Sequence, residues 1–137
     1  ISRGDYVALL AFIARDDAHD AELQRIRCAI RDARQVATCV GFGPRFLHST
    51  GQVYKGGPNT GVFLQLTCDH PHELPVPGHR FGFGVVEAAQ ARGDLAVLAE
   101  RGRRVLRVHL GRDVGAGLAA LRIAIERVLR PSTKEMP

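Results

Sequence analysis

One short segment near the start of the chain restricts the fold more than any other. In residues 5–13, Asp-Tyr-Val-Ala-Leu-Leu-Ala-Phe-Ile, every position after Asp5 is apolar, and apolar and polar side chains do not alternate. This pattern is typical of a central strand that is covered on both faces, as in a parallel sheet. Since parallel strands are joined by crossover connections that are usually helical, the segment predicts an α/β protein.

The rest of the chain alternates between expected helices and strands. Asp16 or Asp17 can cap a helix that runs to about Ala33. Further strands are expected at 35–40, 62–67 and 104–110, and further helices at 85–92, 95–101 and 118–129. This order predicts a three-layer α/β sandwich with a mostly parallel sheet of about four strands.

Three local details complete the expected organisation. Gly93 is expected to end one helix, and Asp94 to cap the next. The segment 104–110 has one half-polar face, which suits an edge strand or a strand that meets a partner. We expect a single domain over residues 1–131 and a frayed tail at 132–137.

Composition indicates an ordinary globular domain. The chain has 137 residues, of which 45% are hydrophobic and 24% are charged. No apolar run approaches the ~20 residues that span a bilayer. No signal peptide opens the chain, and it begins at Ile1 rather than at Met, so we expect a piece of a longer polypeptide. The cysteines, Cys28, Cys39 and Cys68, lack zinc spacing, and a reducing cytoplasm is the expected compartment.

The net charge of +5 is carried almost entirely by arginine, since Lys55 and Lys134 are the only lysines. A basic surface can bind nucleic acids or an anionic substrate. Here the arginines are scattered over several elements and few aromatic residues accompany them. We therefore favour a solvated basic surface over the alternative of a nucleic-acid-binding module.

Residues 41–61 form the most unusual stretch of the sequence. Between two apolar runs, 36–40 and 62–66, the stretch is rich in glycine and in hydrogen-bonding side chains. These side chains are Arg45, His48, Ser49, Thr50, Gln52, Tyr54, Lys55, Asn59 and Thr60. The stretch starts at the carboxyl end of the second expected strand, which is where α/β sheets bind ligands. It is the candidate functional segment.

The residue types in this stretch suit proton transfer on a polar anionic metabolite. Pro44 can open a helix whose first amides and Arg45 would attract an anion. His48 lies three residues after Arg45 and four before Gln52, so a helical turn would place all three on one face.

Histidine is the ordinary proton carrier near neutral pH, and that is the role considered for His48. Ser49 and Thr50 could donate to phosphate or sugar oxygens, and Lys55 could stabilise an oxyanion. The alternative is that His48 only bonds the backbone and that the glycines only turn the chain.

Other candidate motifs are weaker. A metal site formed by Cys68, Asp69, His70 and His72 lacks a second pair of ligands, so no metal is expected. Phe81 and Phe83 flank a glycine turn and are expected to pack inward. Gly82 and Gly84 do not form a dinucleotide-binding fingerprint, which requires Gly-x-Gly-x-x-Gly after a strand.

Two segments resemble one enzyme family. Gly-Phe-Gly-Pro-Arg-Phe-Leu-His-Ser-Thr-Gly-Gln at 41–52 and Lys-Gly-Gly-Pro-Asn-Thr-Gly-Val-Phe-Leu-Gln at 55–65 closely resemble the carboxyl-terminal part of bifunctional transaldolase/phosphoglucose isomerases. The resemblance continues through residues 74–78, 81–84, 89–94 and 104–110. It implies a layered α/β sugar-isomerase domain of the glucose-6-phosphate isomerase family.

The resemblance also implies an activity. The family interconverts glucose 6-phosphate and fructose 6-phosphate without a cofactor. A histidine opens the sugar ring, and a carboxylate moves a proton between C1 and C2 through an enediolate. By this resemblance His48 and Lys55 are the candidate catalytic residues. Arg45, Ser49, Thr50 and Gln52 are the candidate substrate contacts.

The chain also departs from the family. It has no transaldolase barrel and no serine/threonine-rich phosphate loop, and neither Glu73 nor Glu87 is convincing as the catalytic base. We therefore expect the remainder of the isomerase polypeptide, with another sugar-isomerase domain, as a partner, and little or no turnover by the isolated chain. A homodimer is compatible with the family. The alternative is a non-catalytic regulatory domain that binds sugar phosphates; neither function requires nucleic acid or a membrane.

Overall fold

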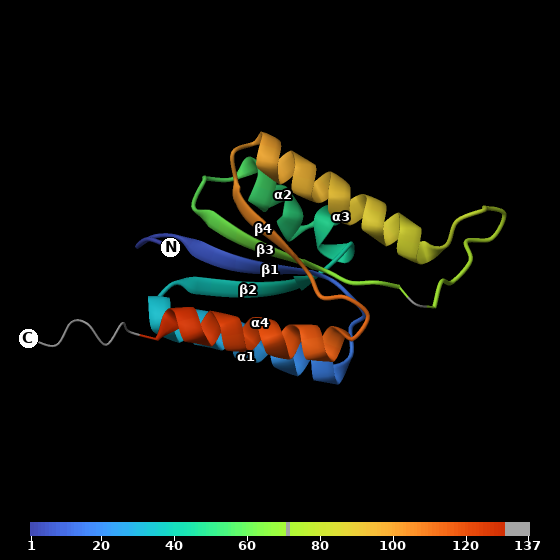
Figure 1. Ribbon diagram of the computed structural model, residues 1–137. Coiled ribbons are helices and arrows are strands. Elements are labelled where there is room, and N and C mark those ends of the chain that lie inside the picture. Colours follow the sequence, from blue (N-terminus) through green and yellow to red (C-terminus); the bar gives the residue numbers. More distant parts are fainter. Residues whose placement is uncertain (71, 131–137) are drawn as a thin grey trace, which may run out of the picture.

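The computed structural model describes residues 1–70 and 72–130, which form a four-stranded, all-parallel sheet between two layers of helices (Figure 1). The strands are β1 (Tyr6–Phe12), β2 (Ala37–Phe42), β3 (Gly61–Thr67) and β4 (Arg104–His109). The helices are α1 (Asp17–Arg34), the 3-10 helix η1 (Arg45–His48), α2 (Thr50–Gly56), α3 (Phe83–Glu100) and α4 (Val114–Leu129). The strand order is β2-β1-β3-β4. The predicted three-layer α/β architecture is confirmed.

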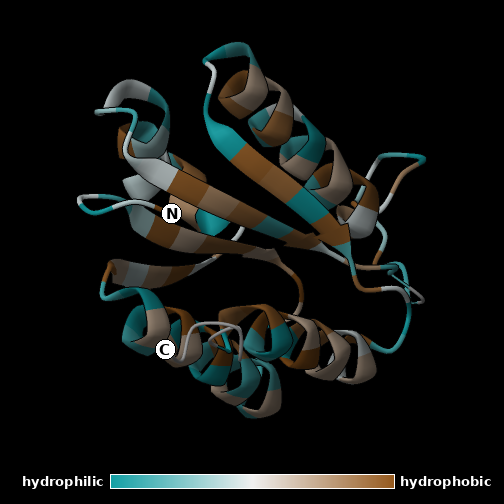
Figure 2. Ribbon diagram, turned by 60° about the vertical axis from the view of Figure 1, so that its left-hand side comes forward, coloured by the Kyte–Doolittle hydropathy of each residue, from teal (hydrophilic) through white to brown (hydrophobic). Residues whose placement is uncertain are grey.

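The apolar segment at the start of the chain is a central strand. β1 pairs with both β2 and β3, and residues 7–13 are all buried. Val7, Leu9 and Ala11 belong to the core beneath α1 and α4, whereas the alternate residues of the strand belong to the core beneath α2 and α3. Figure 2 shows the strands as the most apolar layer, with polar residues on the outer sides of the helices.

Helix α1 forms as the sequence predicts. The Asp16 carboxylate accepts a hydrogen bond from the His19 amide at 2.8 Å and caps the helix. Leu23, Ile26 and Ile30 are buried on the face that meets the sheet.

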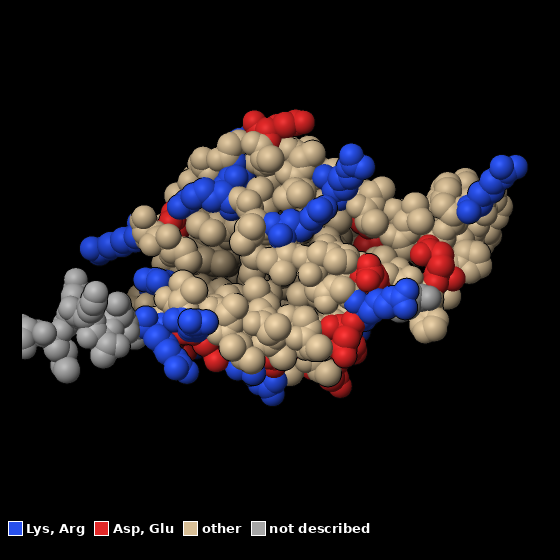
Figure 3. All heavy atoms as spheres, viewed as in Figure 1, with Lys and Arg blue, Asp and Glu red and all other residues tan. Residues whose placement is uncertain are grey.

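The basic side chains of the molecule are spread over several elements (Figure 3).

The expected helix break at Gly93 is wrong. Helix α3 runs without interruption from Phe83 to Glu100. Gly93 is exposed, and its internal position costs only about 1 kcal/mol relative to alanine. Burial of Ala91 and Leu98 on either side of it holds the helix on the sheet. Asp94 is therefore an internal helix residue and not a cap.

The expected inward packing of Phe81 and Phe83 is also wrong, since these side chains are 43% and 55% exposed. The segment before α3 is held by polar contacts instead. A Glu73 carboxylate oxygen accepts a hydrogen bond from the Gly84 amide at 2.8 Å, and Pro75 pairs with Gly82 in an isolated bridge. Glu73 thus satisfies a free amide at the start of the helix.

Strand β4 lies at the edge of the sheet, as its half-polar pattern predicts. Strand β2 reaches Phe42 and so includes the first residues of the glycine-rich stretch, and α4 begins at Val114. In the described part of the chain, no helix is both long enough and apolar enough to cross a membrane. The expected frayed tail at 132–137 lies outside the described residues.

Candidate functional site

The carboxyl edge of the sheet is where this topology favours a ligand. The connection after β1 crosses one face through α1 to β2, whereas the connection after β3 crosses the other face through α3 to β4. Neighbouring strands whose connections diverge leave a crevice beyond their carboxyl ends. Two cavities lie at this edge, one beside β3 and β4 and one beside β1 and β2.

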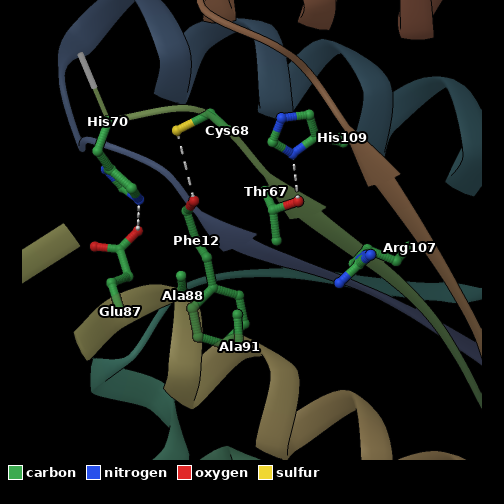
Figure 4. Close-up of a pocket in the computed structure, with 9 residues that line it drawn as sticks. All are labelled: Phe12, Thr67, Cys68, His70, Glu87, Ala88, Ala91, Arg107 and His109. Carbon is green, nitrogen blue, oxygen red and sulfur yellow. Dashed lines mark hydrogen bonds and ion pairs between the residues drawn. The ribbon is translucent and has the colours of Figure 1, made fainter. Parts of the chain in front are cut away.

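The first cavity, which we call the β3–β4 pocket, has a volume of about 260 Å³ (Figure 4). It lies between the carboxyl ends of the strands and the first half of α3. Its lining residues are Phe12, Thr67, Cys68, His70, Glu87, Ala88, Ala91, Arg107 and His109. The pocket thus combines apolar side chains, such as Phe12 and Ala91, with ionisable ones, such as Glu87 and His109.

Glu87 and His70 face one another in this pocket (Figure 4). The Glu87 Oε1 and His70 Nε2 atoms are 3.7 Å apart, which is too long for a hydrogen bond. Oε1 is buried and has no hydrogen-bond partner among residues 1–70 and 72–130. Burial raises the pKa of Glu87, and the nearby His70 opposes this shift only in part. A carboxyl group in this setting is a candidate proton carrier.

Thr67, Cys68 and His109, which also line the pocket, each contact a neighbouring polar group. The two ring nitrogens of His109 lie 3.1 Å from the Thr67 hydroxyl and 3.1 Å from an Asp69 carboxylate oxygen. The Cys68 thiol faces the Phe12 carbonyl at 3.9 Å, and burial raises the pKa of Cys68. Because the thiolate is disfavoured, Cys68 is a poor nucleophile.

The structure does not assemble the weak metal motif. Asp69 pairs with His109, and His70 faces Glu87. Within the described ranges, no three His, Cys, Asp or Glu side chains gather closely enough to hold a metal ion.

The second cavity, which we call the arginine pocket, is more open and has a volume of about 450 Å³. It lies between α1, the end of β2 and η1. Its lining residues are Arg15, Asp20, Gln24, Val40, Phe42, Arg45, Phe46 and Ser49. The Arg15 guanidinium carbon is 5.5 Å from the centre of the Phe42 ring. The pocket therefore brings together two of the sequence-predicted residues, Arg45 and Ser49, with a second arginine.

Three other candidate residues of the stretch, His48, Thr50 and Gln52, are exposed. His48 ends η1, and its side chain makes no hydrogen bond within the described part of the chain. Thr50 and Gln52 belong to α2, and Gln52 donates to the Leu47 carbonyl at 2.9 Å. The single helical face considered for Arg45, His48 and Gln52 does not form because Ser49, with φ −139° and ψ −104°, separates the two helices.

Lys55 is separated from these groups. Its ammonium nitrogen lies 2.6 Å from Asp94 Oδ1, and the Asp94 side chain is only 2% exposed. Arg103, just before β4, donates to the carbonyl oxygens of Lys55 and Gly57 at 2.7 Å each. Lys55 thus ties the end of α2 to α3, near the starts of β3 and β4.

The glycines of the stretch permit close packing around one side chain. Phe46 is 5% exposed. A Cβ atom on Gly51 would lie 2.9 Å from the Phe46 carbonyl oxygen, and one on Gly41 would lie 3.2 Å from its ring. The small residues therefore let η1 and α2 seat against the sheet, which fixes the backbone that presents Arg45 and His48.

Sequence reasoning missed Arg15, His70, Glu87 and Arg107 as pocket residues. Arg15 and His70 follow the carboxyl ends of β1 and β3 by three residues each. Applying the carboxyl-end rule to every strand, and not only to the second, would have found both. Glu87 lies on α3 and has no comparable signal, because only packing shows which face of the helix meets the pocket.

The fold and the two cavities define an α/β protein with ligand-sized, ionisable cavities at the carboxyl edge of a parallel sheet. Comparison with protein-family models and with curated proteins gave no match. Among solved structures, the fold is similar to hypothetical protein TT0462 from Thermus thermophilus, with a TM-score of 0.73 and 15% identity. The match covers 90% of this chain and 34% of that protein, so the chain corresponds to about a third of its length. At this identity the likeness concerns the fold alone.

Proposed function

We propose that the chain is the carboxyl-terminal domain of a glucose-6-phosphate isomerase, which interconverts glucose 6-phosphate and fructose 6-phosphate as part of a longer polypeptide. One observation carries the proposal. Arg45 and Ser49, which belong to the segment that resembles the isomerase family, line one open cavity with Arg15 at the carboxyl edge of the sheet. Two guanidinium groups at one cavity favour an anionic ligand.

The proposed chemistry begins with ring opening. His48 is the proposed acid that protonates the ring oxygen as the bond from that oxygen to C1 breaks, while the C1 hydroxyl gives up its proton to a solvent water and C1 becomes a carbonyl carbon. A carboxylate then takes a proton from C2 to form the enediolate and returns one to C1. The proposal assigns this carboxylate and the phosphate loop to another sugar-isomerase domain.

The other predicted residues take different parts in the proposal. Thr50 and Gln52 are exposed and are the proposed contacts to sugar hydroxyls. Lys55 is proposed as a positioning residue, since its ammonium group pairs with Asp94. The reaction needs no cofactor, suits the cytoplasm and is compatible with a homodimer.

The alternative function is a regulatory domain that binds a sugar phosphate without turnover. It is favoured by the engagement of Lys55 with Asp94 and of Glu73 with the start of α3. Lys55 and Glu73 form contacts that hold helices in place, so these side chains would not be available for catalysis. The two functions share the ligand and differ in the role of His48.

A dehydrogenase-coupled assay tests the catalytic proposal. His48→Ala in the complete polypeptide should lower turnover of glucose 6-phosphate by about a hundredfold or more, the usual contribution of a general acid. His79→Ala is the matched control, because His79 is an exposed histidine that lines neither cavity described above. Turnover of His48→Ala within a few-fold of the unmutated enzyme would refute the assignment.

Two further results separate the alternatives. Saturable binding of fructose 6-phosphate without turnover of either hexose phosphate by the complete polypeptide would favour the regulatory domain. The isolated chain of 137 residues should show little or no turnover. Robust isomerisation by that chain alone would overturn the view that the active site needs a second domain.

A further inference from the structure

An apolar groove lies on the opposite face of the sheet from the β3–β4 pocket, between α4 and strands β3 and β4. Its volume is about 490 Å³, and its walls include Val62, Leu64, Leu106, Ile125 and Val128. Leu106 is 63% exposed and Val128 is 74% exposed. Figure 3 shows the hollow on the viewed face, toward the left, where the strands begin.

The groove exists because one face of the sheet is incompletely covered. On the side of α2 and α3, helix α3 packs against β1, β3 and β4. On the other side, α1 packs against β2 and α4, while the outer parts of β3 and β4 stay open to solvent. Parallel sheets are almost always covered by helices on both faces. The described residues therefore lack a covering element at this position.

Shape and charge restrict what fills the groove. A second copy paired by a two-fold axis would bring the same patch of each chain together, so a hollow would face a hollow. Such pairing would also oppose two chains of net charge +5. Arg34 lines the groove, and Figure 3 shows basic side chains on both sides of the hollow. The surface suits a convex, apolar element with negative charge at its margins.

We propose that this groove is the docking site for an amphipathic helix of a protein partner, with an apolar face and acidic residues on its flanks. The helix would lie beside α4 and complete the layer over β3 and β4. To cover the length of β3, about 23 Å, it needs about 15 residues. Its apolar residues would recur every third or fourth position.

Peptide binding tests the proposal on the chain as it exists. The probe is a fluorescein-labelled peptide of about 18 residues, with leucines at helical spacing and glutamates on the flanks. Fluorescence anisotropy should show saturable binding that weakens as salt is added, because exposed charges are screened. The same peptide with lysines in place of the glutamates should bind about tenfold or more weakly.

Two substitutions on one helix locate the site. Val128→Lys places a charge in the groove and should weaken binding about tenfold or more, as burial of an ammonium group in an apolar site is unfavourable. Ile123→Lys is the matched control, because Ile123 is 60% exposed on α4 but does not line the groove. It should leave binding unchanged. Since both positions are exposed, both variants should fold.

Three results would overturn the proposal. One is equal binding by the acidic and basic peptides, or equal binding to Val128→Lys and the unmutated chain. Another is a dimer in sedimentation velocity that Val128→Lys abolishes, which would make a second copy the occupant. The third is peptide binding that appears only after deletion of residues 131–137, which would make that segment the occupant. None of these results depends on sugar-phosphate binding.

Discussion

At the scale of single residues, surroundings decide which ionisable groups are available for chemistry. Lys55 and Glu87 show this in opposite directions. Lys55 lies in the segment that the sequence singles out, yet its ammonium group is engaged by the buried carboxylate of Asp94. Glu87 is unconvincing as a catalytic base from the sequence, yet it faces a pocket without a hydrogen bond to Oε1 from the described residues.

The setting of Glu87 predicts a pH-dependent gain in stability for Glu87→Gln. Because burial raises the pKa of Glu87 in the folded state, ionising this group opposes folding. Below the ordinary glutamate pKa of about 4.3 the carboxyl is protonated in both the folded and unfolded states. Above the folded-state pKa the penalty is complete, so the variant should be more stable than the unmutated chain near neutral pH.

Urea unfolding at a series of pH values measures this difference. The advantage of Glu87→Gln should shrink as the pH falls and vanish below the ordinary glutamate pKa. Glu100→Gln is the control, since Glu100 is an exposed carboxylate near the end of the same helix. An advantage that is constant with pH, or a variant less stable at neutral pH, would contradict the described setting.

At the scale of elements, sequence patterns correctly predicted the features that depend on neighbouring residues in the chain. The N-cap of α1, its buried face and the edge position of β4 followed from capping and periodicity. The break at Gly93 was wrong because tertiary packing of Ala91 and Leu98 outweighs the weak helix propensity of one glycine. In the stretch 41–61 the sequence indicated only a helix opened by Pro44, whereas the structure has two helices there, η1 and α2, packed around Phe46.

The continuity of α3 predicts that Gly93→Ala stabilises the chain by about 1 kcal/mol, the usual difference between glycine and alanine inside a helix. A Cβ atom at this position meets no heavy atom within 4 Å. Gly84→Ala in the first turn of the same helix is the contrasting variant. There a Cβ atom would lie 2.6 Å from a Glu73 carboxylate oxygen and 2.8 Å from the His70 Cβ.

The thermal unfolding midpoints of both variants test whether α3 is continuous through residue 93. We expect a higher midpoint for Gly93→Ala and a lower one for Gly84→Ala. A lower midpoint for Gly93→Ala would indicate that the residue has a conformation that alanine cannot adopt, and that α3 is broken there after all.

At the scale of the whole molecule, the ionisable cavities and the apolar groove lie at different surfaces of the sheet. The arginine pocket and the β3–β4 pocket lie beyond the carboxyl ends of the strands, whereas the apolar groove lies toward their amino ends. The parallel sheet followed from one apolar segment. Arg45 and Ser49 were candidates from the sequence, but their assembly with Arg15 into one cavity could not be predicted. That assembly depends on how α1 and β2 pack, and periodicity carries no information on it.

The central claim is that the carboxyl edge, including the arginine pocket, binds a hexose phosphate. A titration of the isotopically labelled chain with fructose 6-phosphate, followed by amide chemical shifts, tests it most directly. We predict saturable shifts concentrated at Arg15 and at residues 45–52. Arg45→Ala should weaken binding about tenfold, since a charge-assisted contact is lost. Arg127→Ala, an exposed arginine of α4, should not change it. Absence of saturable shifts, or shifts confined to the apolar groove, would contradict the claim.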